Sequence, residues 1–210
     1  EKPLGNQDGV VITGGSQGAA SKNTVRFNII AGNRNAGVII QAGAFDNVVD
    51  DNFIGVNAAS EPIGNGGDGV FIHNASNNTI GGLDEGSDNL IANNTKSGVR
   101  IEGNQSIGNK IIGNGISENT LAGVFTVESS QTLIDHNRIE GNGESGIFLG
   151  GSTGTIVTSN LIGTDIDGLE ARPNKQAGIL VVSSPGTIIG GDSFEEGGNL
   201  ISGNTLMGIL

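Results

Sequence analysis

The residues most suited to chemistry in this chain are His73, Arg100, Glu102 and Glu128. His73 and Glu102 stand at matching places in two successive repeats, so we expect their side chains to stack about 4.8 Å apart. Glu102 and Glu128 could approach the spacing of a carboxylate pair that hydrolyses a glycosidic bond. Arg100 could act beside them as an electrostatic clamp or as a base. Alternatively, these side chains form an exposed charge cluster that contributes little energy.

These four residues belong to a repeat that runs through the whole chain. Each copy opens with a glycine followed by Val or Ile, at intervals of 23 to 32 residues: Gly9, Gly37, Gly69, Gly98, Gly123, Gly146, Gly178 and Gly208. Periods of this size are typical of solenoids and propellers. The apolar runs are short, rich in Val, Ile and Thr, and bounded by Gly and Asn, which predicts β-strands. The 38 glycines argue against helices.

Two asparagine series recur once per copy. The first, in the pattern Asn-x-Ile, consists of Asn28, Asn52, Asn89, Asn114, Asn137, Asn160 and Asn199. The second stands four residues before the repeat glycines and consists of Asn33, Asn65, Asn94, Asn119, Asn142, Asn174 and Asn204. A corner asparagine suits left-handed backbone geometry, and its amide can bond to the asparagines above and below. Both series are therefore expected to be structural ladders.

The segment 69–82, GVFIHNASNNTIGG, followed by Asn89-Leu-Ile, resembles the right-handed parallel β-helix repeat of the pectin-lyase-like superfamily. The segment 160–165, NLIGTD, is similar to long-turn coils in large bacterial surface and secreted proteins built of that repeat. The resemblance covers essentially the whole chain. It implies an all-β fold, a right-handed parallel β-helix (β-solenoid) with three parallel sheets, about seven coils and no evident end caps. We expect a single domain over residues 1–210, as a segment or subunit of a longer solenoid or filament.

The resemblance implies little about activity, because the superfamily includes lyases, hydrolases, epimerases, tailspikes and non-catalytic adhesins. Its enzymes often hold their active cleft on the first-strand face, where His73, Arg100, Glu102 and Glu128 are the few polar residues. The calcium-binding aspartates of pectate lyases are missing from that face, and an epimerase-type Tyr/His/Asp site fails because the chain has no Tyr. Whether the chain is an enzyme stays open, and the absence of catalysis is the favoured interpretation.

Apolar residues recur at the outward position of the first strand, where alternation predicts solvent. They form the first-strand stripe, which consists of Val11, Ile39, Phe71, Phe125, Phe148 and Leu180. A contiguous stripe indicates an interface. Packing against another chain, a cover of turns and inserts, and a ligand groove are the three explanations. A weaker stripe on the third strand, Ile29, Phe53, Leu90, Leu161 and Leu200, is broken by Gly115 and Arg138.

The net charge of −12, with 10 Lys and Arg, argues against nucleic acid and anionic lipid surfaces as partners. It also weighs against polyanionic sugars, unless calcium bridges the like charges. No cofactor is expected. Calcium is the one ion with weak candidates, Asp165 and Asp167 in an acidic loop, because carboxylate oxygens suit hard cations. Solvated acidic loops are the other interpretation.

The sequence therefore favours a non-catalytic structural β-solenoid, extracellular or at the cell surface, as a filament subunit or a stalk or adhesin segment. Its partner would be itself, through axial stacking of open coil ends and lateral packing of the outward apolar stripes. No membrane insertion is expected. Two alternatives remain: a polysaccharide lyase or hydrolase with a site on the first-strand face, and a calcium-dependent carbohydrate-binding adhesin module.

Overall fold

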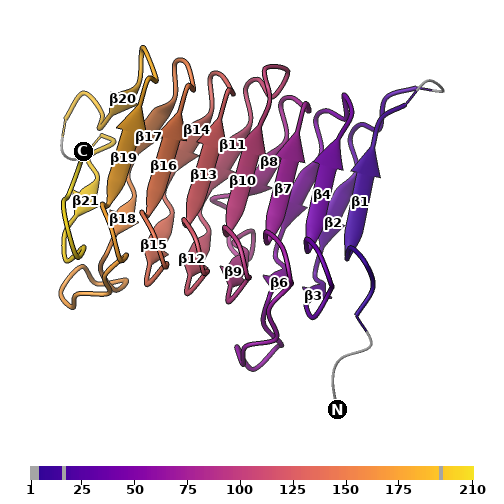
Figure 1. Ribbon diagram of the computed structural model, residues 1–210, viewed down its shortest axis with the longest axis horizontal. Helices are drawn as coiled ribbons and strands as arrows, with labels where there is room; N and C mark the ends of the chain where they lie inside the picture. The colour runs from indigo at the N-terminus through magenta and orange to yellow at the C-terminus, as the bar shows by residue number, and fades with distance from the viewer. Residues whose placement is uncertain (1–4, 16–17, 194–195) are drawn as a thin grey trace.

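The computed structural model describes residues 5–15, 18–193 and 196–210, which form a three-sided parallel β-helix (Figure 1). The first sheet contains β1 (Val10–Thr13), β4 (Val38–Gln41), β7 (Val70–His73), β10 (Val99–Glu102), β13 (Val124–Val127), β16 (Ile147–Gly150) and β19 (Ile179–Val182). The second contains β2 (Thr24–Arg26), β5 (Val48–Asp50), β8 (Thr79–Gly81), β11 (Lys110–Ile112), β14 (Leu133–Asp135), β17 (Ile156–Thr158) and β20 (Ile188–Ile189). The third contains β3 (Ile29–Ile30), β6 (Phe53–Ile54), β9 (Leu90–Ala92), β12 (Gly115–Ser117), β15 (Arg138–Glu140), β18 (Leu161–Ile162) and β21 (Leu200–Ile201).

Each strand pairs in parallel with the equivalent strand one repeat later, so the repeat in the sequence is the register of the sheets. Val99 of β10 lies between Val70 of β7 and Val124 of β13, for example. The expected fold is therefore confirmed: no helix occurs in the described residues, and three parallel sheets have seven strands each. The same residues accordingly contain no helix long and apolar enough to cross a membrane.

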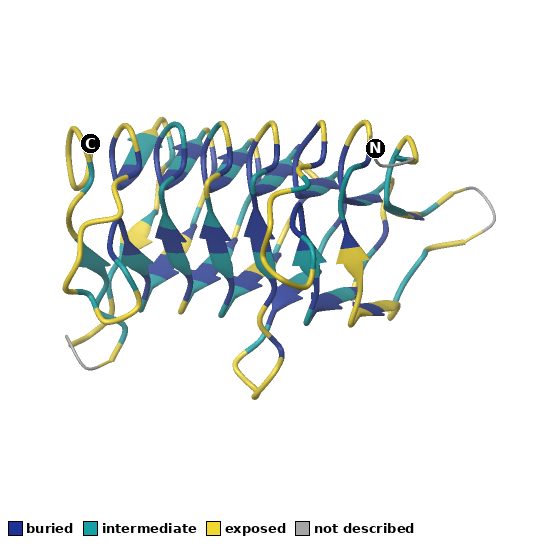
Figure 2. Ribbon diagram, turned by 90° about the horizontal axis from the view of Figure 1, so that it is seen from below, coloured by how far each residue is buried: buried dark blue, intermediate teal, exposed yellow. Residues whose placement is uncertain are grey.

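The core is a column of β-branched residues enclosed by the three sheets. In the first sheet, alternation directs Val99 and Ile101 of β10 inward, and both are fully buried. Ile111 and Ile116 meet them from the second and third sheets of the same coil. Buried residues line the inside of the coils, whereas the turns and inserts are mostly exposed (Figure 2). Burial of this column is the main favourable term in folding.

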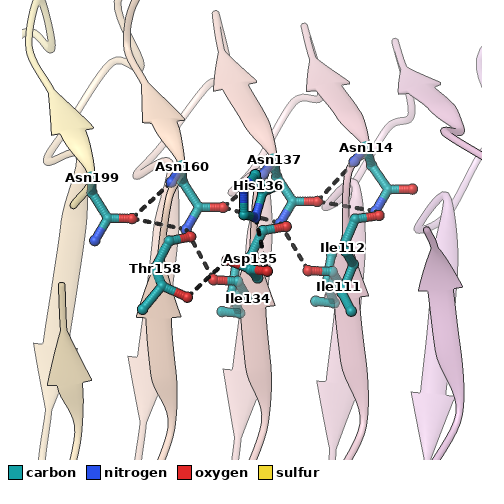
Figure 3. A network of polar contacts seen from close by, with 10 residues as sticks. All are labelled: Ile111, Ile112, Asn114, Ile134, Asp135, His136, Asn137, Thr158, Asn160 and Asn199. Atoms are coloured by element: carbon teal, nitrogen blue, oxygen red, sulfur yellow. Dashed lines mark hydrogen bonds and ion pairs between the residues drawn. The ribbon is translucent and has the colours of Figure 1, made fainter. Parts of the chain in front are cut away.

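The two expected asparagine ladders are present, and their amides bond from coil to coil. Figure 3 shows part of one ladder, in which the Nδ2 group of Asn114 donates to Asn137 Oδ1 at 3.0 Å and that of Asn137 donates to Asn160 Oδ1 at 3.0 Å. Asn137 Nδ2 also donates to the carbonyls of Ile111 and Asp135. Each buried amide thus satisfies backbone groups that a corner would leave unpaired.

The expected left-handed geometry of the ladder asparagines is wrong. The positive φ angle belongs to the preceding residue at most corners, such as Phe27, Glu118 and His136, which have φ of 59°, 54° and 53°. This residue turns the chain, so the following asparagine can direct its amide into the corner. A third ladder joins Asn23, Asn47, Asn78 and Asn109 at the start of the second sheet. Its sequence signal is an asparagine directly before these strands.

The longer coils accommodate their extra residues at two corners. Insert 55–64 and insert 163–173 follow the third sheet, and each folds back as a short hairpin with one antiparallel bridge, Val56 to Pro62 and Thr164 to Ala171. Insert 81–88 and insert 190–198, of which residues 194–195 are not described, precede the third sheet. The coils that open at Gly98 and Gly123 carry neither kind of insert, and their intervals of 25 and 23 residues are the shortest.

Candidate functional site

The four residues expected on the first-strand face do not form one cluster of equivalent positions. His73 and Glu102 are paired in register between β7 and β10, as expected. The residue opposite Glu102 in β13 is Val127, not Glu128. Glu128 follows β13 as an exposed turn residue with φ of 53°. Of the two carboxylates suggested as a hydrolytic pair, that of Glu102 therefore projects from a strand and that of Glu128 from a turn, so they do not occupy equivalent positions.

Arg100 lies between two aromatic rings on the first-strand face. Its guanidinium lies over the rings of Phe71 and Phe125, at 5.4 and 5.3 Å from their centroids. Its Nε also donates to Glu102 Oε2 at 2.9 Å. The two cation–π contacts occupy the faces of the guanidinium, and the ion pair occupies its donors. Each of these interactions contributes roughly 0.5–1 kcal/mol at a partly exposed site.

The aromatic residues of the first-strand stripe continue this stack. Phe125 and Phe148, paired between β13 and β16, are parallel with centroids 4.7 Å apart, whereas the His73 ring stacks on Phe71 at 5.7 Å within the single strand β7. Rings stacked along the axis turn their edges to solvent, whereas a sugar platform needs an exposed face. All six stripe residues remain at least partly exposed, with Val11 the most exposed at 48%. The inserts therefore do not bury the stripe.

A hollow of about 390 Å³ lies beside the stripe, lined by Ile39, Phe71, Asp68, Lys96 and Arg100 among others. Asp68 is only 5% exposed and accepts the Ser97 N–H at 3.0 Å. Burial raises the pKa of Asp68, against the opposing effect of that hydrogen bond. Arg100 and Lys96 both line this hollow, so the two cations face the same space.

A larger groove lies at the corner between the second and third sheets, where sequence reasoning placed no site. This corner groove has a volume of about 450 Å³ and is lined by Asp88, Gly113, Asn114, Gly115, His136, Asn137, Arg138, Ser159, Leu161 and Ile166. The two short coils form its floor, and Asp88 and Ile166 belong to inserts of the coils on either side. The break in the third-strand stripe at Gly115 and Arg138 was its signal in the sequence.

Figure 3 shows a polar network that includes His136, one of the residues that line the corner groove. Asp135 Oδ2 lies 2.9 Å from Nδ1 of His136, and Asp135 Oδ1 accepts the Thr158 hydroxyl at 2.8 Å. The Asp135 side chain is 17% exposed and that of His136 is 52% exposed. Asp135 thus orients the imidazole through Nδ1, so Nε2 is the ring nitrogen that a ligand in the groove could meet.

Arg138 and Glu140 project from the outer face of β15. Arg138 Nε lies 3.4 Å from Glu140 Oε1, and the side chain of Glu140 is 15% exposed. Burial raises the pKa of Glu140, and the nearby Arg138 and Arg172 partly oppose this shift. Glu140 Oε2 is buried and has no hydrogen-bond partner among the described residues. This carboxylate is therefore poorly solvated in its charged form.

The weak calcium candidates, Asp165 and Asp167, lie in the turn of insert 163–173. Asp165 Oδ1 accepts the backbone N–H groups of Glu170 and Leu169 at 3.0 and 2.9 Å, and these bonds, that of Glu170 first, lower the pKa of Asp165. Asp165 therefore caps the turn of insert 163–173, and Asp167 is exposed in the same turn. Within the described ranges, no group of three His, Cys, Asp or Glu side chains is placed to hold a metal ion.

Comparison with known protein families gives one match, to the family described as "Right handed beta helix region", over residues 61–209. The chain belongs to this right-handed β-helix family. The match covers more than half of the sequence, and it agrees with the three parallel sheets. A search of curated protein sequences found no match.

Several solved structures share the fold, among them two epimerases. One is the A-module of the mannuronan C-5 epimerase AlgE6 from Azotobacter vinelandii, with a TM-score of 0.61, 16% identity, and coverage of 96% of this chain and 55% of that one. The other is a mutant of the periplasmic alginate epimerase AlgG, with a TM-score of 0.62, 19% identity, and coverage of 97% and 46%. This chain thus spans about half the length of each structure, and identities this low indicate a shared fold alone.

Proposed function

We propose that this chain is a non-catalytic β-solenoid, a rigid stalk, filament or adhesin segment of an extracellular or cell-surface protein. The observation that supports this proposal best is that Arg100 is already bound by neighbouring side chains of the same face. This cation, which a lyase or hydrolase on the first-strand face would use as a clamp or base, is held between Phe71 and Phe125 and paired with Glu102. In this position the Arg100 guanidinium is one layer of a stack of side chains that runs along the axis of the coils. We therefore assign it a structural role.

The regularity of the coils supports the same proposal. Two asparagine ladders run through all seven coils, a third joins the first four, and the apolar core is continuous from coil to coil. A stack held in this way resists bending, because each coil contacts its neighbours along all three sheets. The first-strand stripe then offers a half-exposed apolar surface along the rod, and we propose that a second copy packs against it.

An activity assay with matched variants tests the proposed absence of catalysis. The purified chain is incubated with neutral and acidic polysaccharides, and new reducing ends and unsaturated products are measured. We expect the wild type to release no more product than Glu102→Gln. Activity that persists through purification, is lost in Glu102→Gln and is retained in Glu85→Gln, an exposed loop control, would favour the enzyme and contradict the proposal.

A further inference from the structure

We propose that the corner groove binds a short stretch of a neutral, hydroxyl-rich oligosaccharide. This binding site is independent of the structural role proposed above, because it lies at the corner between the second and third sheets. The first-strand face and its stripe take no part in it. The groove runs along the axis from Asp88 to Ile166, across three coil steps or about 14 Å. Its volume of about 450 Å³ lies within the range of small-molecule sites.

The lining of the groove fits a ligand with many hydroxyl groups. Arg138 provides donors, Asp88 provides acceptors, and Ser159 provides both. His136 uses Nδ1 for its contact with Asp135, so its Nε2 is available to a ligand. Sugar hydroxyls can both donate and accept, so such a mixed set can satisfy them. Leu161 and Ile166, from the coil at one end, add apolar surface for the C–H face of a ring.

The backbone around the groove disfavours an extended peptide. β12 pairs with β9 and β15, and β15 pairs with β12 and β18, so the floor strands have neighbours on both sides. A peptide that binds by strand addition needs an unpaired edge. The groove lacks one along these strands, and its polar contacts come from side chains.

Charge disfavours a polyanionic ligand. Arg138 is paired with Glu140 and His136 with Asp135, while Asp88 adds a further carboxylate at the rim. The chain as a whole carries a net charge of −12. A uronate polymer or a nucleic acid would meet repulsion without a local excess of cations. A neutral saccharide meets no such repulsion.

Gly115 provides a sharp variant, because it forms a notch in the floor. A Cβ added there would lie 3.5 Å from Leu90 Cδ1 and 3.7 Å from Arg138 Nη2, which are ordinary contacts. Its φ angle is not in the positive range. Gly115→Leu therefore fills the groove without backbone strain and extends the third-strand stripe. Lys110→Leu, an exposed strand position of the same coil on the second sheet, is the matched control.

The experiment is an ¹⁵N amide titration with tetrasaccharides of glucose, xylose and mannose, and with tetragalacturonate as the acidic comparison. We expect at least one neutral tetrasaccharide to shift the amides of Gly113, Gly115 and Arg138 in a saturable way. Gly115→Leu should weaken this binding at least tenfold, and Asp88→Asn about threefold, while Lys110→Leu should leave it unchanged.

Three results would overturn the proposal: no saturable groove shifts with any neutral sugar, tight binding of tetragalacturonate alone, or wild-type affinity in Gly115→Leu. A thermal melt of each variant checks that the fold is intact, and the rim variant Asp88→Asn leaves the core untouched. None of these outcomes bears on the depolymerisation assay, so the two proposals fail separately.

Discussion

At the scale of single residues, Glu140 carries a charge that its surroundings disfavour. Its side chain is 15% exposed, its Oε2 has no hydrogen-bond partner in the part of the chain that the structure describes, and Asp165 and Glu118 add like charge nearby. Burial raises the pKa of Glu140, so the folded chain holds this proton more tightly than the unfolded chain. Stability from this residue is consequently lost as the pH rises from the unfolded pKa through the higher folded pKa.

We expect Glu140→Gln to stabilise the chain at pH 7, by about 0.5–1 kcal/mol, the usual yield of relieving unfavourable charge. The gain should vanish below about pH 4, near the reference pKa of a glutamate, where the wild type is protonated in both states. Urea unfolding of wild type and variant across pH measures this difference. Glu85→Gln, which removes the same charge from an exposed loop, should show no such pH dependence. A lower stability of Glu140→Gln at pH 7 would contradict this explanation.

At the scale of elements, the asparagine ladders connect the corners of successive coils. Asn137 accepts from the backbone N–H and the amide of Asn114, and donates to Ile111, Asp135 and Asn160. Removing this amide orphans buried donors and acceptors in two neighbouring coils. An unsatisfied buried group costs about 1–3 kcal/mol, so the loss of one ladder amide affects the coils on either side of its own.

We expect Asn137→Ala to lower the free energy of unfolding by about 2–4 kcal/mol, because more than one buried partner loses its hydrogen bond. Asn104→Ala, in an exposed turn outside the ladders, should change it by less than about 0.5 kcal/mol. Chemical denaturation of both variants measures the contrast. Equal effects in the two variants would mean that the ladder contributes no more than a surface asparagine.

The fold could be predicted from the sequence because the same glycines and asparagines recur at equivalent positions in each coil. Two details could not be predicted in this way. The left-handed corner position is occupied by residues as different as Phe27, Glu118 and His136, since the path of the backbone, not the side chain, requires it. The corner groove forms where two coils without inserts, those of Gly115 and Arg138, lie between coils that carry them. The pattern of a single repeat does not show this arrangement.

At the scale of the whole molecule, the rod combines a half-exposed apolar stripe with a net charge of −12. The stripe favours side-by-side packing of two copies, whereas their like charges oppose it. Salt screens this repulsion, and the screening length falls to about 3 Å at 1 M. A stripe one strand wide over seven coils is small for a stable interface, so we expect weak association that strengthens with salt.

Sedimentation velocity of the purified chain at about 1 M salt tests the structural proposal most directly. We expect the wild type to form larger species as its concentration rises, and to do so less at low salt. Phe148→Ser, which removes the stack on Phe125, should remain a single small species, while Leu133→Ser, a half-exposed control on the second sheet, should behave as the wild type does. A single species at every concentration and salt level, unaffected by Phe148→Ser, would contradict the proposed lateral packing.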